Sequence, residues 1–248
     1  DGDGAMGYSI SFSDAAGNAG TAVTSGSGAV TIDNTHPTLN TPALTVNGAG
    51  NANNADVVSL AFTSATDVTT APVCAFSDSG AAMENSPSTA TGSASGWTCA
   101  ITVDDTDADG AITYSISFSD ASGNAGVAVT SGSGSVTIDN THPTLSTPAI
   151  SDNAGGLDVN DGDTATLTFT SSTDVTTAPT CAFEDGADAA MDAGTSTATG
   201  DATGWTCTVA VGDGDASGAM GYTISFSDAS GNAGVAVTSG SGSVTIDN

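Results

Sequence analysis

One block of 23 residues occurs three times in this chain and limits what the chain can fold into. Residues 118–140 and 226–248 share one sequence without a change, FSDASGNAGVAVTSGSGSVTIDN. Residues 12–34 repeat it with three changes, at Ala16, Thr21 and Ala29. Tyr8, Tyr114 and Tyr222 mark equivalent positions, so the period is 106 and then 108 residues. A long sequence that returns at a fixed period indicates an array of like modules.

The period divides the chain into two full repeats and one partial repeat. The full repeats are residues 35–140 and 141–248, which open with the near-identical phrases THPTLNTPAL and THPTLSTPAI. Each has the size of an ordinary single domain. Residues 1–34 correspond to the C-terminal part of a preceding repeat, and two strands alone cannot bury a core. We therefore expect the sequence to be a window from a longer chain.

The residue pattern of one full repeat predicts an all-β fold. In the second repeat, residues 165–170 (ATLTFT) and 205–211 (WTCTVAV) alternate between apolar and polar positions, as half-buried strands do. Further strands are expected at 180–183 and 220–227, and a final strand over 235–237 and 244–246 is interrupted at 239–242. An edge strand is expected at 145–150, and a loop that could include a short strand over 184–203. About seven short strands without helical periodicity predict a two-sheet β-sandwich in each repeat.

The charge of the chain excludes several classes of partner. The 248 residues contain no lysine or arginine and 28 aspartates and glutamates, which gives a formal net charge of −28. Nucleic acid and anionic lipid both need a basic surface, so neither is expected as a partner. No apolar run approaches 18 residues, so no insertion into a membrane is expected. Self-repulsion favours an extended, soluble array.

The cysteines occur as one pair in each full repeat. Four cysteines allow three pairings. Equivalence between the repeats selects Cys74–Cys99 and Cys181–Cys207, while buried free thiols are the alternative reading. A zinc site would need other spacings and nearby histidines. Disulfides form in oxidising surroundings, which indicates an extracellular or cell-surface protein.

The last third of each repeat and its junction with the next resemble bacterial immunoglobulin-like repeats. The resemblance is carried by the run I-x-F-S-D-x-x-G-N-x-G and the later V-T-I-D-N-T-x-P-T-L, with Asp120, Gly123, Asn124, Asp139 and Pro143 among the matching residues. Such repeats occur in tandem in large secreted adhesins and biofilm matrix proteins. The resemblance implies tandem immunoglobulin-like sandwiches and a spacer role in a surface fibre. The cysteine pair departs from antibody domains, which bridge different strands.

An acidic loop before the tyrosine strand is the main candidate metal site. Carboxylates at alternate positions followed by glycine can wrap oxygen ligands around Ca²⁺. The alternative is an acidic loop without a metal, and no bidentate glutamate occupies the twelfth position. The predicted calcium ligands recur in all three copies, and the site is expected to bind weakly. They are Asp105, Asp107 and Asp109; Asp213, Asp215 and Ser217; Asp1 and Asp3.

Two further motifs surround the junctions between repeats. Oxygen ligands for a divalent ion could lie where two repeats meet, supplied by Asp33 and Asn34 at one junction and by Asp139 and Asn140 at the other. The alternative is that these residues belong to a short linker stiffened by proline. The D-x-x-G-N motif reads as a structural turn in which the acidic and amide side chains bond turn amides. Its residues are Asp14 and Asn18, Asp120 and Asn124, and Asp228 and Asn232.

These patterns favour a structural function. We expect a spacer segment of a long extracellular adhesin or fibre, whose partners are neighbouring repeats and whose stiffness calcium could increase. The alternative is a subunit of an assembled filament or surface layer in which like chains pack against one another. A carbohydrate-binding module would need an exposed aromatic platform, for which few aromatics are present. No nucleophile–base arrangement is visible, so an enzyme is not expected.

Overall fold

The computed structural model describes residues 1–47, 51–153 and 158–248, and the regular elements in these ranges are β-strands. By contacts the chain divides into two compact units. The first unit comprises Asp1–Thr45, Val58–Ile101 and Ile112–Ser135, and the second comprises Val46–Val57, Thr102–Ala111 and Val136–Asn248. This division passes through residues 35–140, so the predicted repeat boundaries remain an inference from the sequence.

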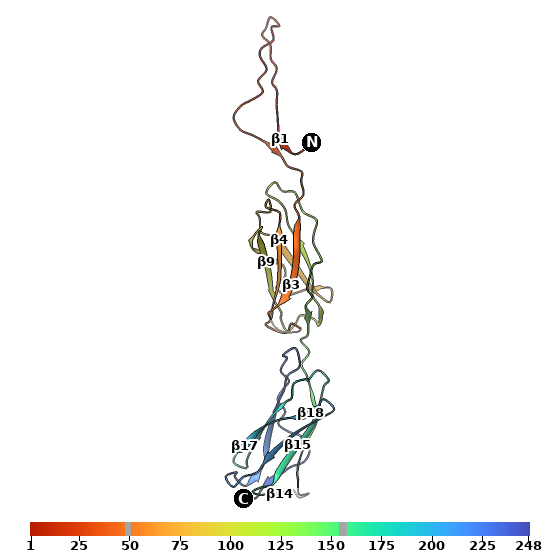
Figure 1. Ribbon diagram of the computed structural model, residues 1–248, viewed down its shortest axis with the longest axis vertical. Helices are drawn as coiled ribbons and strands as arrows, with labels where there is room; N and C mark the ends of the chain where they lie inside the picture. The colour runs from red at the N-terminus through yellow and green to blue at the C-terminus, as the bar shows by residue number, and fades with distance from the viewer. Residues whose placement is uncertain (48–50, 154–157) are drawn as a thin grey trace. The chain divides into compact units, whose positions relative to one another are not determined.

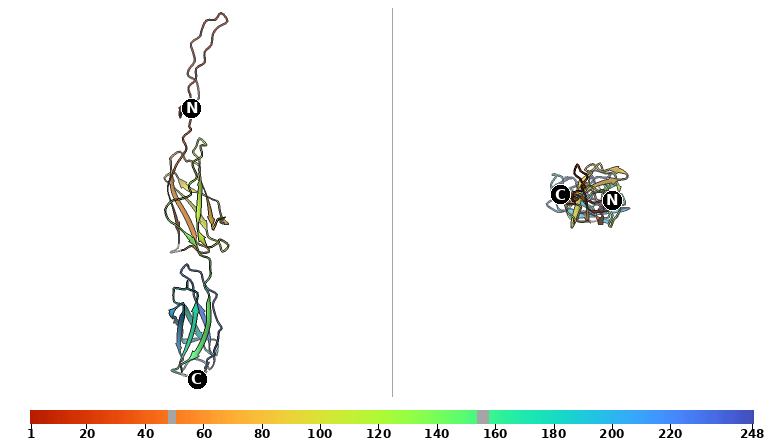
Figure 2. Two further views of the ribbon diagram at one scale, coloured as in Figure 1. Left: turned by 90° about the vertical axis from the view of Figure 1, so that its right-hand side faces the viewer. Right: turned by 90° about the horizontal axis from the view of Figure 1, so that it is seen from above.

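The partial repeat forms an open ribbon. Its strands β1 (Gly4–Ala5) and β2 (Thr31–Ile32) pair antiparallel, and isolated bridges join Ile10 to Val23 and Ser13 to Ala19. Residues 1–34, all of which the structure describes, contribute no second layer of strands to this ribbon (Figures 1 and 2). Four of its apolar side chains are therefore between 46% and 56% exposed, namely Met6, Tyr8, Ile10 and Phe12.

Two larger sheets build the rest of the first unit. One has the strand order β3-β4-β9-β8, and β3, β4 and β9 are labelled in Figure 1. The other has the order β11-β5-β6, with β7 also paired to β5. The strands of the first sheet are β3 (Leu39–Val46), β4 (Val57–Ser64), β8 (Thr91–Ser93) and β9 (Gly96–Thr102). Those of the second are β5 (Val73–Asp78), β6 (Ala81–Ala82), β7 (Ser88–Thr89) and β11 (Thr113–Ser117).

The sheets of the second unit follow the same plan. Their strand orders are β13-β15-β19-β18, β17-β16-β21, β14-β22-β20 and β10-β12. In the first of them the long strands are β13 (Leu145–Asp152), β15 (Thr164–Ser171) and β19 (Gly204–Ala210), with the short β18 (Thr199–Asp201). The second contains β16 (Thr180–Glu184), β17 (Ala190–Thr197) and β21 (Gly221–Ser225). The remaining strands have two residues each: β10 (Gly110–Ala111), β12 (Thr137–Ile138), β14 (Asp158–Val159), β20 (Gly218–Ala219) and β22 (Thr245–Ile246).

Each full repeat is a β-sandwich closed by a disulfide. Cys74 on β5 is bonded to Cys99 on β9, and Cys181 on β16 is bonded to Cys207 on β19, so each bond connects the two sheets of its repeat. Both pairings agree with the prediction from repeat equivalence, and the described cysteines include no free thiol. Since the strands alternate, every second side chain enters the core. In the second repeat this core includes Leu167, Phe169, Phe183, Trp205, Val209 and Ile224.

The strand predictions were correct where apolar and polar residues alternate. Strands β13, β15, β16, β19 and β21 lie where they were expected, and β13 is an edge strand of its sheet. Residues 184–203, expected as a loop that could include a short strand, contain the two strands β17 and β18. Of the interrupted final strand, the second part forms β22, whereas the first part was wrong, since only an isolated bridge from Val237 to Ile224 forms there. Over the described ranges, the fold contains no helix that is long and apolar enough to cross a membrane.

Candidate functional site: the linkers and their anchoring points

The candidate site is built from three motifs that recur in each repeat. The linkers are the segments 33–37 and 139–143, which both read DNTHP. The turns are the D-x-x-G-N segments. The acidic loops are the segments 1–4, 104–110 and 212–218. In the described structure these motifs contact one another inside each compact unit. The contacts of the first linker lie within the first unit, and those of the second linker lie within the second.

The turn is held together by its aspartate. In the turn of the first full repeat, the backbone N–H and the Nδ2 of Asn124 donate to the two carboxylate oxygens of Asp120, each at 2.8 Å. Gly123 takes a φ of 96°, which favours glycine. Burial acts to raise the pKa of Asp120, but the hydrogen bonds from Asn124 outweigh it and hold that pKa below its ordinary value. The same bonds recur in the turns of Asp14 and Asp228.

The aspartate of each linker docks on a turn. The hydroxyl of Ser122 donates to Oδ2 of Asp33 at 2.7 Å, and Nδ2 of Asn124 donates to the Asp33 carbonyl at 3.0 Å. In the second unit the hydroxyl of Ser230 donates to Oδ2 of Asp139 at 2.6 Å, and Nδ2 of Asn232 donates to the Asp139 carbonyl at 2.7 Å. The turn residues predicted to be structural are therefore also binding residues.

The histidine of each linker adds a contact next to the same turn. Nδ1 of His36 lies 2.7 Å from the carbonyl oxygen of Ala125, and Nδ1 of His142 lies 2.8 Å from that of Ala233. Because a carbonyl oxygen only accepts, Nδ1 must carry the hydrogen in both rings. The two histidines thus orient their linkers by the same bond.

The asparagine and threonine of each linker bind an acidic loop instead. The backbone N–H of Asn34 donates to Oδ1 of Asp3 at 2.7 Å, and the hydroxyl of Thr35 donates to Oδ2. Chiefly through the bond from Thr35, the pKa of Asp3 is held below its ordinary value. In the second linker Asn140 and Thr141 bind Asp109 in the same way, with 2.6 Å for the backbone bond.

At residue 248 the same contact is made with a different side chain. The backbone N–H of Asn248 donates to the hydroxyl of Ser217 at 3.0 Å, and its Nδ2 donates to the carbonyl of Gly212 at 2.8 Å. Ser217 stands where the other loops have Asp3 and Asp109. A hydroxyl therefore serves as well as a carboxylate at this position of the loop.

The predicted calcium ligands are not brought together into one ligand set. Asp107 and Asp215 are buried, and their Oδ2 atoms accept the backbone N–H of Asp104 and Gly212, both at 2.8 Å. Asp109 holds the linker, as does Asp3, while Asp105 and Asp213 are exposed. In the described ranges no three histidine, cysteine, aspartate or glutamate residues are grouped as metal ligands. Calcium binding by these loops therefore stays a prediction.

The predicted junction metal has one structural feature in its favour. An Oδ1 atom of Asp67 is buried without a hydrogen-bond partner, and the equivalent atom of Asp174 is in the same state. The carbonyl of Asp67 accepts the N–H of Ala121 in the turn, so this loop lies beside the docked linker. The predicted ligands Asp33 and Asp139 already accept serine hydroxyls. Metal binding at the junction therefore also stays a prediction.

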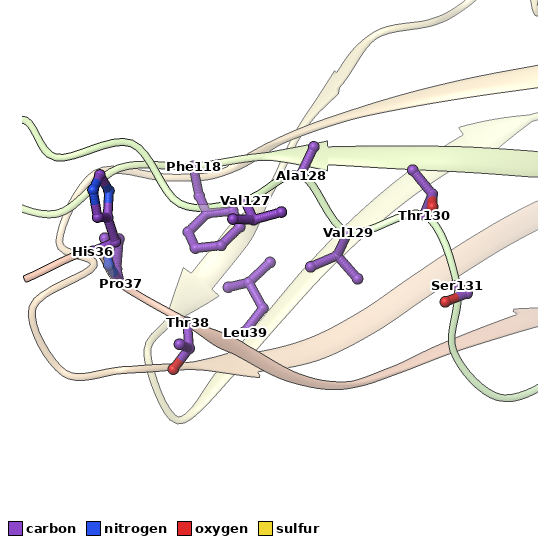
Figure 3. Close-up of a pocket in the computed structure, with 10 residues that line it drawn as sticks. All are labelled: His36, Pro37, Thr38, Leu39, Phe118, Val127, Ala128, Val129, Thr130 and Ser131. Carbon is purple, nitrogen blue, oxygen red and sulfur yellow. The ribbon is translucent and has the colours of Figure 1, made fainter.

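An apolar groove lies beside each docked histidine. In the first unit it has a volume of about 420 Å³ and is lined by His36, Leu39, Phe118, Val127 and neighbouring residues (Figure 3). Val127 is 84% exposed, and its equivalent Val235, at 85%, borders a similar groove in the second unit. The lining contains no acid, amine or thiol, and its polar side chains are those of His36, Thr38, Thr130 and Ser131.

The sequence predicted the turns, linkers and acidic loops as separate motifs but not the bonds between them. Ser122 and Ser230 were missed entirely, although they are the residues that bind the linker carboxylates. The signal that could have found them is that the three motifs recur in the same order in each repeat.

Comparisons with solved structures return multidomain β proteins. The chain is similar to a tetra-tandem repeat in the extending region of a large adhesion protein, with 21% identity and a TM-score of 0.34, covering 99% of this chain and 57% of that one. It is similar to a marsupial T cell receptor, with 12% identity and a TM-score of 0.42 over 84% of this chain and 73% of that one. It is also similar to the FN1–FN3 domains of chicken CNTN1, with 13% identity and a TM-score of 0.41 over 98% and 78%.

No protein-family model matches the sequence, and no curated protein matches it. The TM-scores of the structural neighbours are too low for an argument about activity. The neighbours are of the kinds expected from the sequence, namely adhesin repeats and immunoglobulin-like or fibronectin-like sandwiches.

Proposed function

We propose that this chain is a spacer segment of a long extracellular adhesin or surface fibre, built from tandem immunoglobulin-like sandwiches. The observation that carries the proposal is the repeated linker. Two linkers of identical sequence make the same bonds, through Asp33 and Asp139 to a turn and through Asn34 and Asn140 to an acidic loop. A chain that repeats both its domains and its joints serves to set a distance.

Two other features support the extracellular part of the proposal. Each full repeat contains a disulfide, and disulfides persist in oxidising compartments. The net charge of −28 without any basic side chain suits a surface that must stay solvated and resist self-association. Neither feature requires a substrate, which is consistent with a structural rather than catalytic role.

Surface labelling of intact cells tests this function. Antibodies raised against residues 141–248 should label cells that produce the protein without permeabilisation, and immunogold particles should lie away from the cell envelope. The labelled protein should migrate on a denaturing gel as one chain much longer than 248 residues. Labelling that appears only after permeabilisation would contradict the proposal.

A further inference from the structure

We propose that the D-x-x-G-N turn is a docking surface for the linker, and that Ser122 with Asn124, and Ser230 with Asn232, fix the course of the linker that enters their own repeat. The inference rests on the proposed spacer function and names the residues that would define its joints. The ligand of the surface is a segment of this chain, the D-N-T-H sequence of the linker.

The bonds that shape the turn are distinct from those that join it to the linker. In residues 14–18 the backbone N–H groups of Ala16 and Asn18 donate to Oδ1 of Asp14, and Nδ2 of Asn18 donates to Oδ2, all at 2.9 Å. Within the described part of the chain no linker lies against this turn, yet its internal bonds match those of the other two. The bonds from turn to linker are therefore additional to those that shape the turn.

The asparagine at the end of the turn can serve both partners because its amide has two hydrogens. In Asn124 one hydrogen stays in the turn on Asp120, and the other reaches the carbonyl of Asp33, which is 91 residues away in sequence. Asn232 divides its hydrogens in the same way between Asp228 and Asp139. An aspartate at this position would lose both donors.

The serine in the turn supplies the stronger contact. Its hydroxyl donates to a carboxylate, and hydrogen bonds to a charged acceptor are shorter and stronger than those between neutral groups. The distances of 2.7 Å at Asp33 and 2.6 Å at Asp139 fit this description. The turn at 14–18 has Ala16 at this position, so a turn of that kind would hold its linker with one bond fewer.

The turns of the two full repeats are shielded from water. Asp120 is 3% exposed, Asp228 is 4% exposed and Asn232 is 5% exposed. The linker and the remaining strands of each complete repeat together exclude water from the turn. Hydrogen bonds in such surroundings are strengthened, and unpaired groups there are costly.

The order of residues in the linker gives the surface its specificity. Asp33 and His36 bind the turn and its neighbour Ala125, whereas Asn34 and Thr35 between them bind Asp3 of the acidic loop. The same division holds for the linker at 139–142. Both outer residues of the D-N-T-H sequence thus bind one partner and both inner residues bind the other.

The Ser122→Ala variant of the 248-residue chain tests the inference. This change removes one hydroxyl, reproduces the natural Ala16, and leaves the bonds inside the turn intact. Hydrogen exchange by NMR should show the amides of Asn34 and Thr35 exchanging about threefold to tenfold faster, the factor expected for one lost hydrogen bond. The amides of Asn140 and Thr141 should be unchanged, and Ser230→Ala should give the converse result.

Two controls separate docking from a general loss of structure. Ser135 is exposed, and the equivalent residue of the partial repeat is Ala29. Ser135→Ala should therefore leave hydrogen exchange in both linkers unchanged. Asn18→Ala should loosen its own turn without altering either linker, whereas Asn124→Ala should loosen the turn and also release residues 33–36. If Ser122→Ala leaves exchange in the first linker unaltered while its turn remains folded, the docking proposal is wrong. Surface labelling is independent of this outcome, so the spacer function would stand or fall separately.

Discussion

At the scale of single residues, aspartates act here as acceptors for N–H and O–H groups, since no lysine or arginine is present to pair with them. Side-chain bonds from Thr35, Asn18 and Thr203 lower the pKa values of Asp3, Asp14 and Asp201, respectively. Backbone N–H groups, that of Ala216 foremost, lower the pKa of Asp185. A carboxylate whose folded-state pKa is lowered stabilises the fold above its unfolded pKa, near 3.8, and this contribution is lost as the pH falls through the folded value.

The threonine of the linker should control the pKa of one such carboxylate. Thr35→Val removes the hydroxyl that donates to Asp3, so the pKa of Asp3 should rise toward its ordinary value. Titration of the carboxyl carbon by NMR between pH 2 and pH 7 measures the change. Thr141→Val, the same substitution in the other linker, should leave the pKa of Asp3 where it is. An unchanged value in the Thr35 variant would show that this bond does not form in solution.

Single-residue reasoning from sequence identified the aspartates of the turns and acidic loops but not the distant groups that they bind in the structure. Asp109 was predicted as a calcium ligand because it follows two acids at alternate positions. In the structure it accepts the amide of Asn140, 31 residues further along the chain. Spacing along the chain can suggest a local set of metal ligands. It does not show which hydrogen-bond donor from a distant part of the sequence lies against the loop in the fold.

At the scale of elements, the sequence was informative wherever one face of a strand is buried. The alternation in β15 and β19 follows directly from the inward positions of Leu167, Phe169, Trp205 and Cys207. Strand β17 was expected only as a short strand within a loop, because most of its residues are small or polar, and it pairs with β16 through Thr195, Ser196 and Thr197. An edge strand with a solvated face can form without the apolar alternation that a pattern search needs.

The parallel pairing of β14 with β22 could not be predicted from local pattern at all. Asp158 and Val159 pair with Thr245 and Ile246, which lie in another third of the repeat. Two-residue strands carry no periodicity, and their existence depends on the completed sandwich. The residues at 158–159 are therefore positioned by tertiary contacts alone.

A glycine beside the tyrosine strand should be intolerant of a side chain. A Cβ at Gly132 would overlap the carbonyl oxygen of Pro42 and crowd the hydroxyl of Tyr114, so Gly132→Ala should lower the free energy of unfolding by about 1–3 kcal/mol. Gly96→Ala is the matched control, since a Cβ at Gly96 meets no atom within 4 Å. Hydrogen exchange by mass spectrometry on peptides from residues 35–140 measures both. Equal stability of the two variants would refute the close approach at Gly132.

Each disulfide should stabilise its own repeat. Cys74→Ala with Cys99→Ala opens a loop closed over 25 residues, which is worth about 3–4 kcal/mol in the chain-entropy model. Scanning calorimetry should show a lowered transition for one repeat, and exchange by mass spectrometry should locate it in residues 35–140. The double variant of Cys181 and Cys207 should instead weaken residues 141–248. A loss of protection shared equally by both repeats would mean that they do not unfold independently.

At the scale of the whole molecule, repulsion among 28 acidic side chains opposes folding with no internal cation on lysine or arginine to offset it. Added salt screens such repulsion over a Debye length of about 10 Å at 0.1 M. The Tm should therefore rise between 10 mM and 500 mM NaCl, as measured by calorimetry at pH 7. At pH 4, where part of the charge is neutralised, the rise should be smaller. A Tm that does not respond to salt at pH 7 would show that the charges are too far apart to matter.

Bound calcium would reduce the repulsion between acidic side chains only near its binding site, whereas salt reduces it over the whole chain. If the acidic loops or the junctions bind the ion, millimolar Ca²⁺ should raise the Tm above the value reached with matched ionic strength of NaCl, and EDTA should reverse the rise. Asp109 accepts the amide of Asn140. A calcium ion at the same carboxylate would compete for its negative charge and weaken that bond, so exchange at the amide should accelerate as the ion binds. Identical melting with calcium and with EDTA would remove the calcium hypothesis.

The disulfide across each sandwich also limits how far a stretched repeat can lengthen. Pulling on the two ends of residues 35–140 would extend the unfolded chain by about 3.5 Å per residue, but the segment between Cys74 and Cys99 cannot extend because the disulfide joins its ends. A separation of 25 residues corresponds to roughly 90 Å of chain length that stays unavailable while the disulfide is intact. A tether made of such repeats would yield in shorter increments under load and would lengthen further once exposed to a reductant.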